Sequence, residues 1–290
     1  PNAPTDAYGL AKLVNNAFGK SFQTFQSESM LKISQFKWVP QKDGYDKARK
    51  LLTPSIRYDL RDVWDGPEIT TQQREVALTP QQQKLMADLK RDLMVQVKTG
   101  ALVTATNEAA ARQKFIQISL GAIYDAKHDI HLIDAKPRLS ELKDILEQAP
   151  GKCLIFSPLT SIVNLLYREL KKEYACEIVY GDTSTKDRNR IFEAFQRSDD
   201  SEPRILVADP GTMAHGLDLW RARTVIWYGT CESTEEYLQA NRRAYRPGQK
   251  YPVTAVQIVS NKLEREIYRR LDTNTSLQGA LLEMVRKGEL

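Results

Sequence analysis

Three arginines lie close together near the C-terminal end of the chain, with no acidic residue among them. The stretch QANRRAYRPGQ, residues 239–249, contains Arg242, Arg243 and Arg246. In a helix, the i, i+4, i+7 spacing of Gln239, Arg243 and Arg246 puts them on one face. The donors of a guanidinium match a carboxylate or a phosphate. The stretch therefore predicts an anion site, and the alternative is a solvated basic helix face.

Capping signals define the helix that must position these side chains. Ser233 and Glu236 have the S-x-x-E spacing of a capping box, so we expect the helix to begin near Thr234. It must end by Arg246, because Pro247 disfavours a helical residue before it. Tyr237 and the alanines of this segment can then pack against the protein, and Arg242 lies off the shared face.

Composition and charge limit the class of protein. The chain has 290 residues, of which 41% are hydrophobic and 27% charged, which is typical of a globular protein. A net charge of +5 permits binding to a polyanion without requiring it. Three scattered cysteines without a C-x-x-C pair indicate a reducing compartment, no disulfides and no metal site. Because no apolar run is long enough to span a bilayer, we expect no membrane contact and a cytoplasmic location.

From about residue 137, short β-branched runs alternate with amphipathic helices. The runs are CLIF (153–156), EIVY (177–180), ILVA (205–208), TVIWY (224–228) and VTAVQIV (253–259). This alternation predicts an α/β fold with a doubly wound, mostly parallel sheet. Ligands bind such sheets at the carboxyl ends of the strands. We expect SPLTS, GDTSTKDR, DPGTMAHG and GTCESTEE on that edge, with Gly216 and Arg243 on the same edge.

The first 136 residues follow a different pattern. TDAYGLAKLVNNAF predicts a helix, QREVALTPQQQKLMADLKRDLM a strand that leads into a helix capped at Thr79, and NEAAARQKFIQISLGAIYD another helix. These elements include too few strands for a complete sheet. They therefore predict the end of one domain followed by a mostly helical connector, and the opening PNAPTDAYGL suggests that the start of a longer protein is missing.

The segments VADPGTMAHGLDL and QANRRAYRPGQ resemble two motifs of the Swi/Snf-type helicase-like ATPases of superfamily two, and most closely the branch common in bacteriophages. KCLIFSPLTSIVNLL, VYGDTSTKDRNRIFEAFQ and IDAKPRLSELKDIL resemble further segments of the second RecA-like lobe, in the same order. The resemblance implies the end of the first lobe and a connector at 1–105, the second RecA-like lobe at 106–272 and a C-terminal helix at 273–290.

The resemblance also implies roles for the residues near the arginines. Arg243 and Arg246 act as arginine fingers, which place their charge on the transferring phosphoryl group of ATP. Gln239, Gly216 and Asp218 contact the nucleotide, although Asp218 stands where Asn is common, which puts its contact in doubt. Tyr245 and Pro247 also depart from the usual residues and leave the arginine spacing intact.

A third group of residues is implied to bind DNA. Its members follow strand ends, where hydroxyl and basic groups can reach phosphates. They are Ser157, Gly181, Thr183, Arg188, Thr212 and His215. Ser157 and Thr183 are equally good candidates for helix caps. Trp220 and Trp227 are predicted to pack around a strand.

Two motifs expected of a complete motor are not in the sequence. The chain contains no G-x-x-x-x-G-K-[ST] phosphate loop and no D-E-x-[HD] box. We therefore expect ATP and Mg²⁺ to be held mainly by an N-terminal lobe outside this chain, and the chain alone to be inactive.

The leading hypothesis is the C-terminal half of a DNA-dependent ATPase that translocates on, or remodels, duplex DNA. Alternatives are a strand-separating helicase and a non-catalytic nucleic-acid-binding module. A doubly wound methyltransferase is disfavoured, because no G-x-G follows the first strand.

Overall fold

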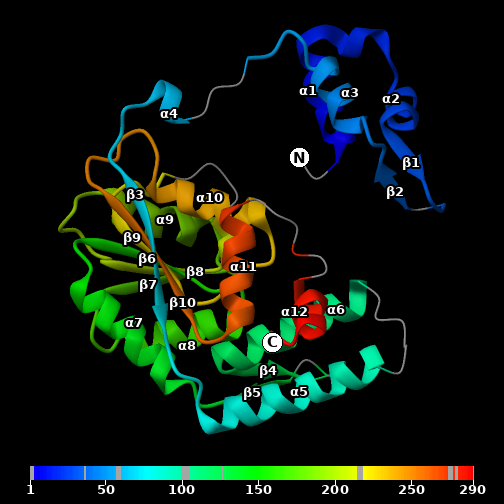
Figure 1. The fold of residues 1–290 in the computed structure, drawn as a ribbon. Coiled ribbons are helices and arrows are strands. Elements are labelled where there is room, and N and C mark those ends of the chain that lie inside the picture. Colours follow the sequence, from blue (N-terminus) through cyan, green and yellow to red (C-terminus); the bar gives the residue numbers. More distant parts are fainter. Residues whose placement is uncertain are drawn as a thin grey trace. The chain divides into compact units, whose positions relative to one another are not determined.

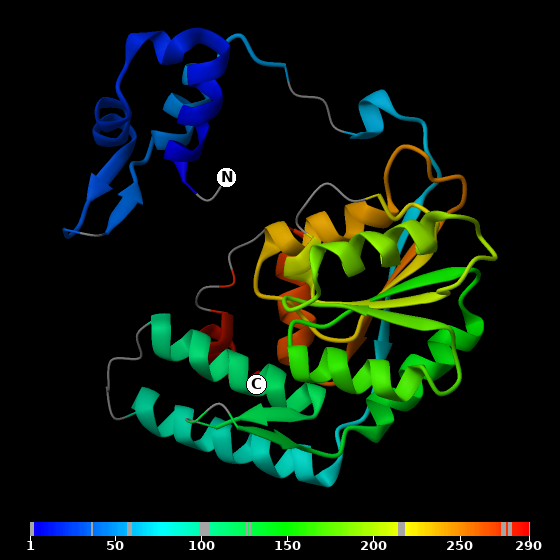
Figure 2. The ribbon, with the colours of Figure 1, turned by 180° about the vertical axis from the view of Figure 1, so that it is seen from behind.

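The computed structural model describes residues 3–35, 37–56, 60–98, 105–125, 127, 129–213, 218–273, 277 and 280–289. The chain divides into two compact units, Pro1–Asp65 and Gly66–Leu290, and each is described by itself. Figures 1 and 2 show their elements from opposite sides.

The first unit is small and mostly helical. The helix predicted from TDAYGLAKLVNNAF is confirmed as α1, which ends where Asn16 adopts a left-handed conformation with φ 55°. Phe25 and several alanines form the core, whereas Leu13 is 85% exposed. The elements are η1 (Pro4–Asp6), α1 (Ala7–Asn15), η2 (Asn16–Gly19), α2 (Phe22–Ser29), the antiparallel strands β1 (Met30–Lys32) and β2 (Trp38–Pro40), α3 (Gly44–Leu51) and α4 (Leu60–Val63).

The second unit is built on a six-stranded, fully parallel sheet. The strands are β3 (Ile69–Glu75), β6 (Lys152–Phe156), β7 (Cys176–Val179), β8 (Ile205–Ala208), β9 (Ala222–Trp227) and β10 (Val253–Val259). Their order across the sheet is β3-β10-β9-β6-β8-β7. The central strands are mostly apolar and buried because helices cover both faces. The predicted parallel α/β sheet is confirmed, including all five strands expected after residue 137.

Helices pack on both faces of this sheet. Figures 1 and 2 show α7 (Lys136–Gln148) and α8 (Thr160–Leu170) on one side, and α9 (Thr185–Gln196) and α10 (Thr234–Ala244) on the other. Beside the sheet lie α5 (Pro80–Lys98), α6 (Ala105–Leu120) and the hairpin β4 (Ala122–Tyr124) and β5 (Ile130–Leu132). The chain continues from β10 into α11 (Lys262–Asp272) and α12 (Ala280–Lys287).

The predicted division at residues 105 and 106 is wrong, because β3 belongs to the sheet of the second unit. All seven residues of β3 align in parallel register with the seven residues of β10. The strand ITTQQRE is polar and largely exposed, as an edge strand can be. Nothing in that pattern identifies a pairing partner about 180 positions away. The apolar side chains of α5 and α6 complete the same core.

The helix boundaries agree with most of the predicted signals. The predicted cap of α5 is confirmed: Gln82 N donates to Thr79 Oγ1 (3.3 Å), and Thr79 N donates to Gln82 Oε1 (2.9 Å). The helix predicted for NEAAARQKFIQISLGAIYD stops early, at Leu120. Gly121 turns the chain there with φ 90°, and AIY becomes β4.

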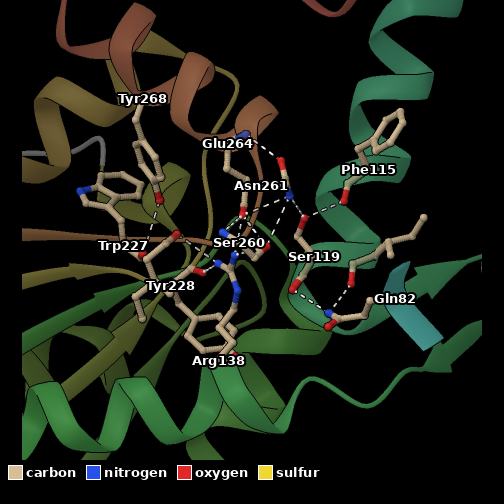
Figure 3. Close-up of polar contacts among 12 residues, drawn as sticks. Gln82, Phe115, Ser119, Arg138, Trp227, Tyr228, Ser260, Asn261, Glu264 and Tyr268 are labelled. Carbon is tan, nitrogen blue, oxygen red and sulfur yellow. Dashed lines mark hydrogen bonds and ion pairs between the residues drawn. The ribbon is translucent and has the colours of Figure 1, made fainter. Parts of the chain in front are cut away.

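A buried ion pair joins the elements at the carboxyl ends of β9 and β10 (Figure 3). Arg138 of α7 is 2% exposed, and its Nη2 donates to Glu264 Oε2 of α11 at 2.6 Å. The same guanidinium donates to the carbonyls of Tyr228 and Ile258, which follow β9 and lie in β10. Asn261 Nδ2 donates to Ser119 Oγ (2.8 Å) and so extends the network to α6. Helices from distant parts of the sequence are thereby tied to one edge of the sheet.

Candidate functional site

The arginines of QANRRAYRPGQ lie at and just beyond the end of α10. The predicted start is confirmed: α10 begins at Thr234, and Ser233 Oγ accepts a hydrogen bond from Glu236 N (3.2 Å). The predicted end is also confirmed, since Ala244 is the last helical residue. Gly248 turns the chain with φ 108°, and a Cβ there would lie 3.3 Å from the indole of Trp220. Glycine is therefore required at this turn.

Arg243 and Arg246 lie close together, and a carboxylate pairs with Arg246. Arg246 Nη1 forms an ion pair with Asp218 Oδ1. Burial, and then the charge of Arg246, lower the pKa of Arg243, while Asp218 opposes this shift. Arg242 is exposed. Two partly buried guanidiniums thus lie near the Asp218 carboxylate at the end of α10.

Only two of the three side chains predicted to share a helix face belong to α10. Gln239 and Arg243 lie one turn apart within α10, and Gln239 Nε2 donates to Glu235 Oε1 at 3.1 Å. Arg246 lies beyond the last helical residue, so helical periodicity does not place it. The loop that follows α10 and the ion pair with Asp218 position Arg246 instead.

Gln249 holds that loop in place, and the sequence did not single it out. Its side chain is 5% exposed, and Nε2 donates to the carbonyls of Trp220 (2.5 Å), Ala222 (2.9 Å) and Ala244 (3.1 Å). Its Oε1 accepts hydrogen bonds from the backbone N–H groups of residues 250 and 251. One amide therefore joins the end of α10 to the start of β9. The signal available in the sequence was a glutamine directly after a Pro-Gly turn.

The arginines do not share an edge with the polar clusters that follow the strands. Helix α10 begins after the carboxyl end of β9 and returns toward the edge where β10 begins. Leu219 N, just before β9, donates to Arg243 O at 3.0 Å. Arg243 therefore lies toward the opposite edge from SPLTS, GDTSTKDR and GTCESTEE. The expectation of a common edge is wrong for Arg243, and Gly216, which was expected beside it, lies outside the described residues.

The segment DPGTMAHG, residues 209–216, begins in a tight turn after β8. Gly211 N donates to Asp209 Oδ1 (2.8 Å), and Thr212 Oγ1 donates to Asp209 O (2.6 Å). The predicted DNA-contacting hydroxyl of Thr212 thus closes this turn. His215 lies outside the described residues, as does Gly216. Asp218, just beyond this segment, contacts Arg246.

Two carboxyl groups lie close to Gly211, those of Glu236, which the sequence singled out only as part of a capping box, and of Asp209, which it did not single out. A Cβ at Gly211 would be 3.2 Å from Asp209 Oδ1 and 3.8 Å from Glu236 Oε1. Burial raises the pKa of Asp209. Burial, followed by the negative charge of Asp209, raises the pKa of Glu236. An acidic patch therefore lies at the N-terminal end of α10, while positive charge gathers at its C-terminal end.

The remaining predicted DNA contacts differ in their exposure. Ser157 is fully buried, and its Oγ accepts a long hydrogen bond from Leu159 N (3.5 Å), so its side chain is not available to DNA. Thr183 Oγ1 accepts from Tyr180 N (3.0 Å) and closes a turn. Ser184, the next residue, caps α9 instead. Gly181 is exposed and Arg188 is partly buried in the first turns of α9, so both stay predictions.

Tryptophan and cysteine side chains in this region pack inside the protein. Trp227 is fully buried between Phe156 and Tyr237, with ring centroids 5.0 and 4.8 Å away, as predicted. The cysteines are free, and burial raises the pKa of the Cys153 thiol to about 11 and that of Cys231 to about 12. Across the described residues, no group of three or more His, Cys, Asp or Glu could hold a metal ion. Within the same residues, no helix has the length and apolar character needed to cross a membrane.

Sequence comparison relates this region to helicases. Residues 137–248 match the family model described as the helicase conserved C-terminal domain. DNA repair and recombination protein RAD54B of Mus musculus is 28% identical over 140 residues, which cover 48% of this chain and 16% of that protein. DEAD-box ATP-dependent RNA helicase 53 of Oryza sativa subsp. japonica is 30% identical over 117 residues, which cover 40% of this chain and 18% of that protein. The matches thus span less than a fifth of either relative.

Structural comparison extends the likeness over more of the chain. The C-terminal part of the Fun30 ATPase domain matches with a TM-score of 0.55 at 17% identity, over 76% of this chain and 97% of that chain. The Sulfolobus solfataricus SWI2/SNF2 ATPase core in complex with dsDNA matches with a TM-score of 0.54 at 19% identity, over 96% of this chain and 59% of that chain. At these low identities the likeness establishes the fold alone, and this fold is the predicted RecA-like lobe. Residues 137–248 therefore match the helicase conserved C-terminal domain, and the fold is similar to that of the C-terminal domains of SWI2/SNF2 ATPases.

Proposed function

We propose that this chain is the C-terminal half of a DNA-dependent ATPase that couples ATP hydrolysis to translocation on, or remodelling of, duplex DNA. The observation that carries the proposal is the pair of partly buried guanidiniums, Arg243 and Arg246, at the end of α10. They lie inside the helicase conserved C-terminal domain. The fold shared with the SWI2/SNF2 core crystallised with dsDNA supports DNA as the partner.

The arrangement suits stabilisation of charge on a phosphoryl group. Negative charge spreads over the equatorial oxygens as the γ-phosphoryl leaves ATP, and an inserted guanidinium is worth about 10³–10⁵ in rate. Arg243 is partly desolvated by burial, which strengthens its interaction with an anion. We propose that Arg243 and Arg246 act on that group as arginine fingers. ATP and its Mg²⁺ would be held mainly by a first lobe outside this chain.

A DNA surface is proposed on the edge that carries the turns after β7 and β8. Gly181 and Arg188 are the residues there that we retain as contacts, because Ser157 is buried. Contacts of this kind reach phosphates and carry no sequence information directly. The proposal therefore expects binding to duplex DNA without strong sequence preference.

The test is steady-state ATP hydrolysis at saturating DNA, in a protein that joins this chain to a first helicase lobe. Arg243→Ala and Arg246→Ala should each lower the rate by at least about 100-fold, because a finger acts on charge that develops in the transition state. Their affinity for DNA should change little. Lysine at either position should rescue poorly, because an ammonium lacks the planar fork of donors.

Arg242→Ala is the matched control, since Arg242 neighbours Arg243 and is exposed. It should leave ATP turnover nearly unchanged. Normal turnover in both the Arg243 and the Arg246 variants would refute the proposed roles. DNA binding without DNA-stimulated hydrolysis, even with the first lobe joined, would favour a non-catalytic binding module. Separation of strands in the same protein would favour a true helicase.

A further inference from the structure

Asp218 and Arg246 form a pair that solvent and ligands can reach. The Asp218 side chain is 54% exposed and that of Arg246 is 34% exposed. An exposed ion pair of this kind contributes little to the free energy of folding. Its presence therefore gives only weak support for a purely structural role. Its location matters more, because Arg246 is one of the two guanidiniums proposed to meet phosphate.

The backbone around Asp218 is anchored independently of this ion pair. Leu219, the next residue, donates its N–H to Arg243 O at 3.0 Å. Gln249 Nε2 joins the carbonyls of Trp220 and Ala244. Asp218 is therefore held within reach of the end of α10 even when its carboxylate contacts nothing.

A phosphate that approaches Arg246 must compete with a carboxylate that is already present. Both anions use the same guanidinium N–H donors, so binding of one weakens binding of the other. Asp218 also lies near Arg243, whose pKa it acts to raise. The carboxylate thus offsets part of the positive charge of these two guanidiniums while no phosphate is bound.

We propose that Asp218 is an exchangeable counter-ion for Arg246, which holds the guanidinium in the empty site and yields it to the polyphosphate chain of a nucleoside triphosphate. The identity of the ligand rests on the proposed function. The exchange itself rests on the contact between Asp218 and Arg246. Asparagine at this position would keep the shape and remove the charge that competes with phosphate.

The exchange is testable on the 290-residue chain, with inorganic tripolyphosphate as the probe and calorimetry at low ionic strength as the measurement. Asp218→Asn should tighten tripolyphosphate binding by about two- to fivefold, the range that corresponds to an exposed ion pair. Asp218→Glu should bind the probe as weakly as the unaltered chain. Because Asp218 is exposed, thermal melts of each variant should match that of the unaltered chain.

Two further variants separate this exchange from a general effect of charge. Asp144→Asn removes an exposed carboxylate from α7, on the other side of the sheet from α10, and should leave the affinity unchanged. In an Arg246→Ala background, Asp218→Asn should no longer tighten binding, because its partner is missing. Equal tightening by Asp144→Asn, or the same effect of Asp218→Asn with and without Arg246, would overturn the proposal.

Failure of this inference is distinguishable from failure of the proposed function. Coupling between Asp218 and Arg246 is measured by binding of the probe, whereas the role of the arginines is measured by ATP hydrolysis. Coupled binding together with normal hydrolysis in the arginine variants would leave the exchange standing and remove the ATPase role. Uncoupled binding together with lost hydrolysis would remove the exchange and leave the ATPase role of the arginines standing.

Discussion

Replacement of Arg138 by methionine should destabilise the second unit strongly. Arg138 and Glu264 are 2% and 1% exposed, and the guanidinium also donates to two backbone carbonyls and to Ser260 Oγ. Removing one partner leaves the Glu264 carboxylate buried with its charge unpaired, which costs about 3–5 kcal/mol. In a domain of this size, about 1 kcal/mol shifts the melting temperature by roughly 2–4 °C, so we expect a fall of about 6–20 °C.

The measurement is chemical and thermal unfolding of the unaltered chain and its variants. Arg138→Met combined with Glu264→Gln should be more stable than Arg138→Met alone, because no buried charge is left without its partner. Glu169→Gln is the control: it removes the exposed pair with Lys172, 2.9 Å long, and should cost no more than about 1 kcal/mol. An Arg138→Met variant as stable as this control would refute the reasoning.

Three further outcomes are expected. Gln249→Ala leaves several buried backbone groups without their partner and should cost about 1–3 kcal/mol in chemical unfolding; a cost within error of zero would contradict the anchoring role. Glu236→Gln should stabilise the protein at neutral pH. The raised pKa of Glu236 means that its ionised form opposes folding. This penalty disappears as pH falls through the raised pKa of the folded state toward the ordinary value of 4.5. The stability advantage of the variant should therefore shrink over the same pH range. Affinity for duplex DNA, measured by fluorescence anisotropy, should fall steeply with salt and vary little with sequence, and binding that is flat in salt would count against contacts to phosphate.

Local rules were sufficient for many of the individual elements. Apolar β-branched runs predicted five strands, two of them, β8 and β10, to the residue. The limits of α10 followed from a capping serine at Ser233 and from a Pro-Gly turn. Capping residues, turns and apolar runs depend only on residues a few positions apart, so they can be recognised from the sequence alone. The family resemblance rested on the same short segments, and its assignment to a phage branch and the residue roles that it implies stay predictions.

Long-range pairing and the direction of α10 were decided by the tertiary structure. β3 is a polar strand, and its position in the sheet depends on backbone pairing with the outer side of β10. Arg246 lies past the helix end, so its position depends on Asp218 and on the loop that Gln249 anchors, and no helical periodicity predicts it. The sequence by itself determined which residue types could meet a phosphate and which elements contain them. Only the fold decided that Asp218 pairs with Arg246, because that contact joins residues that no local rule relates.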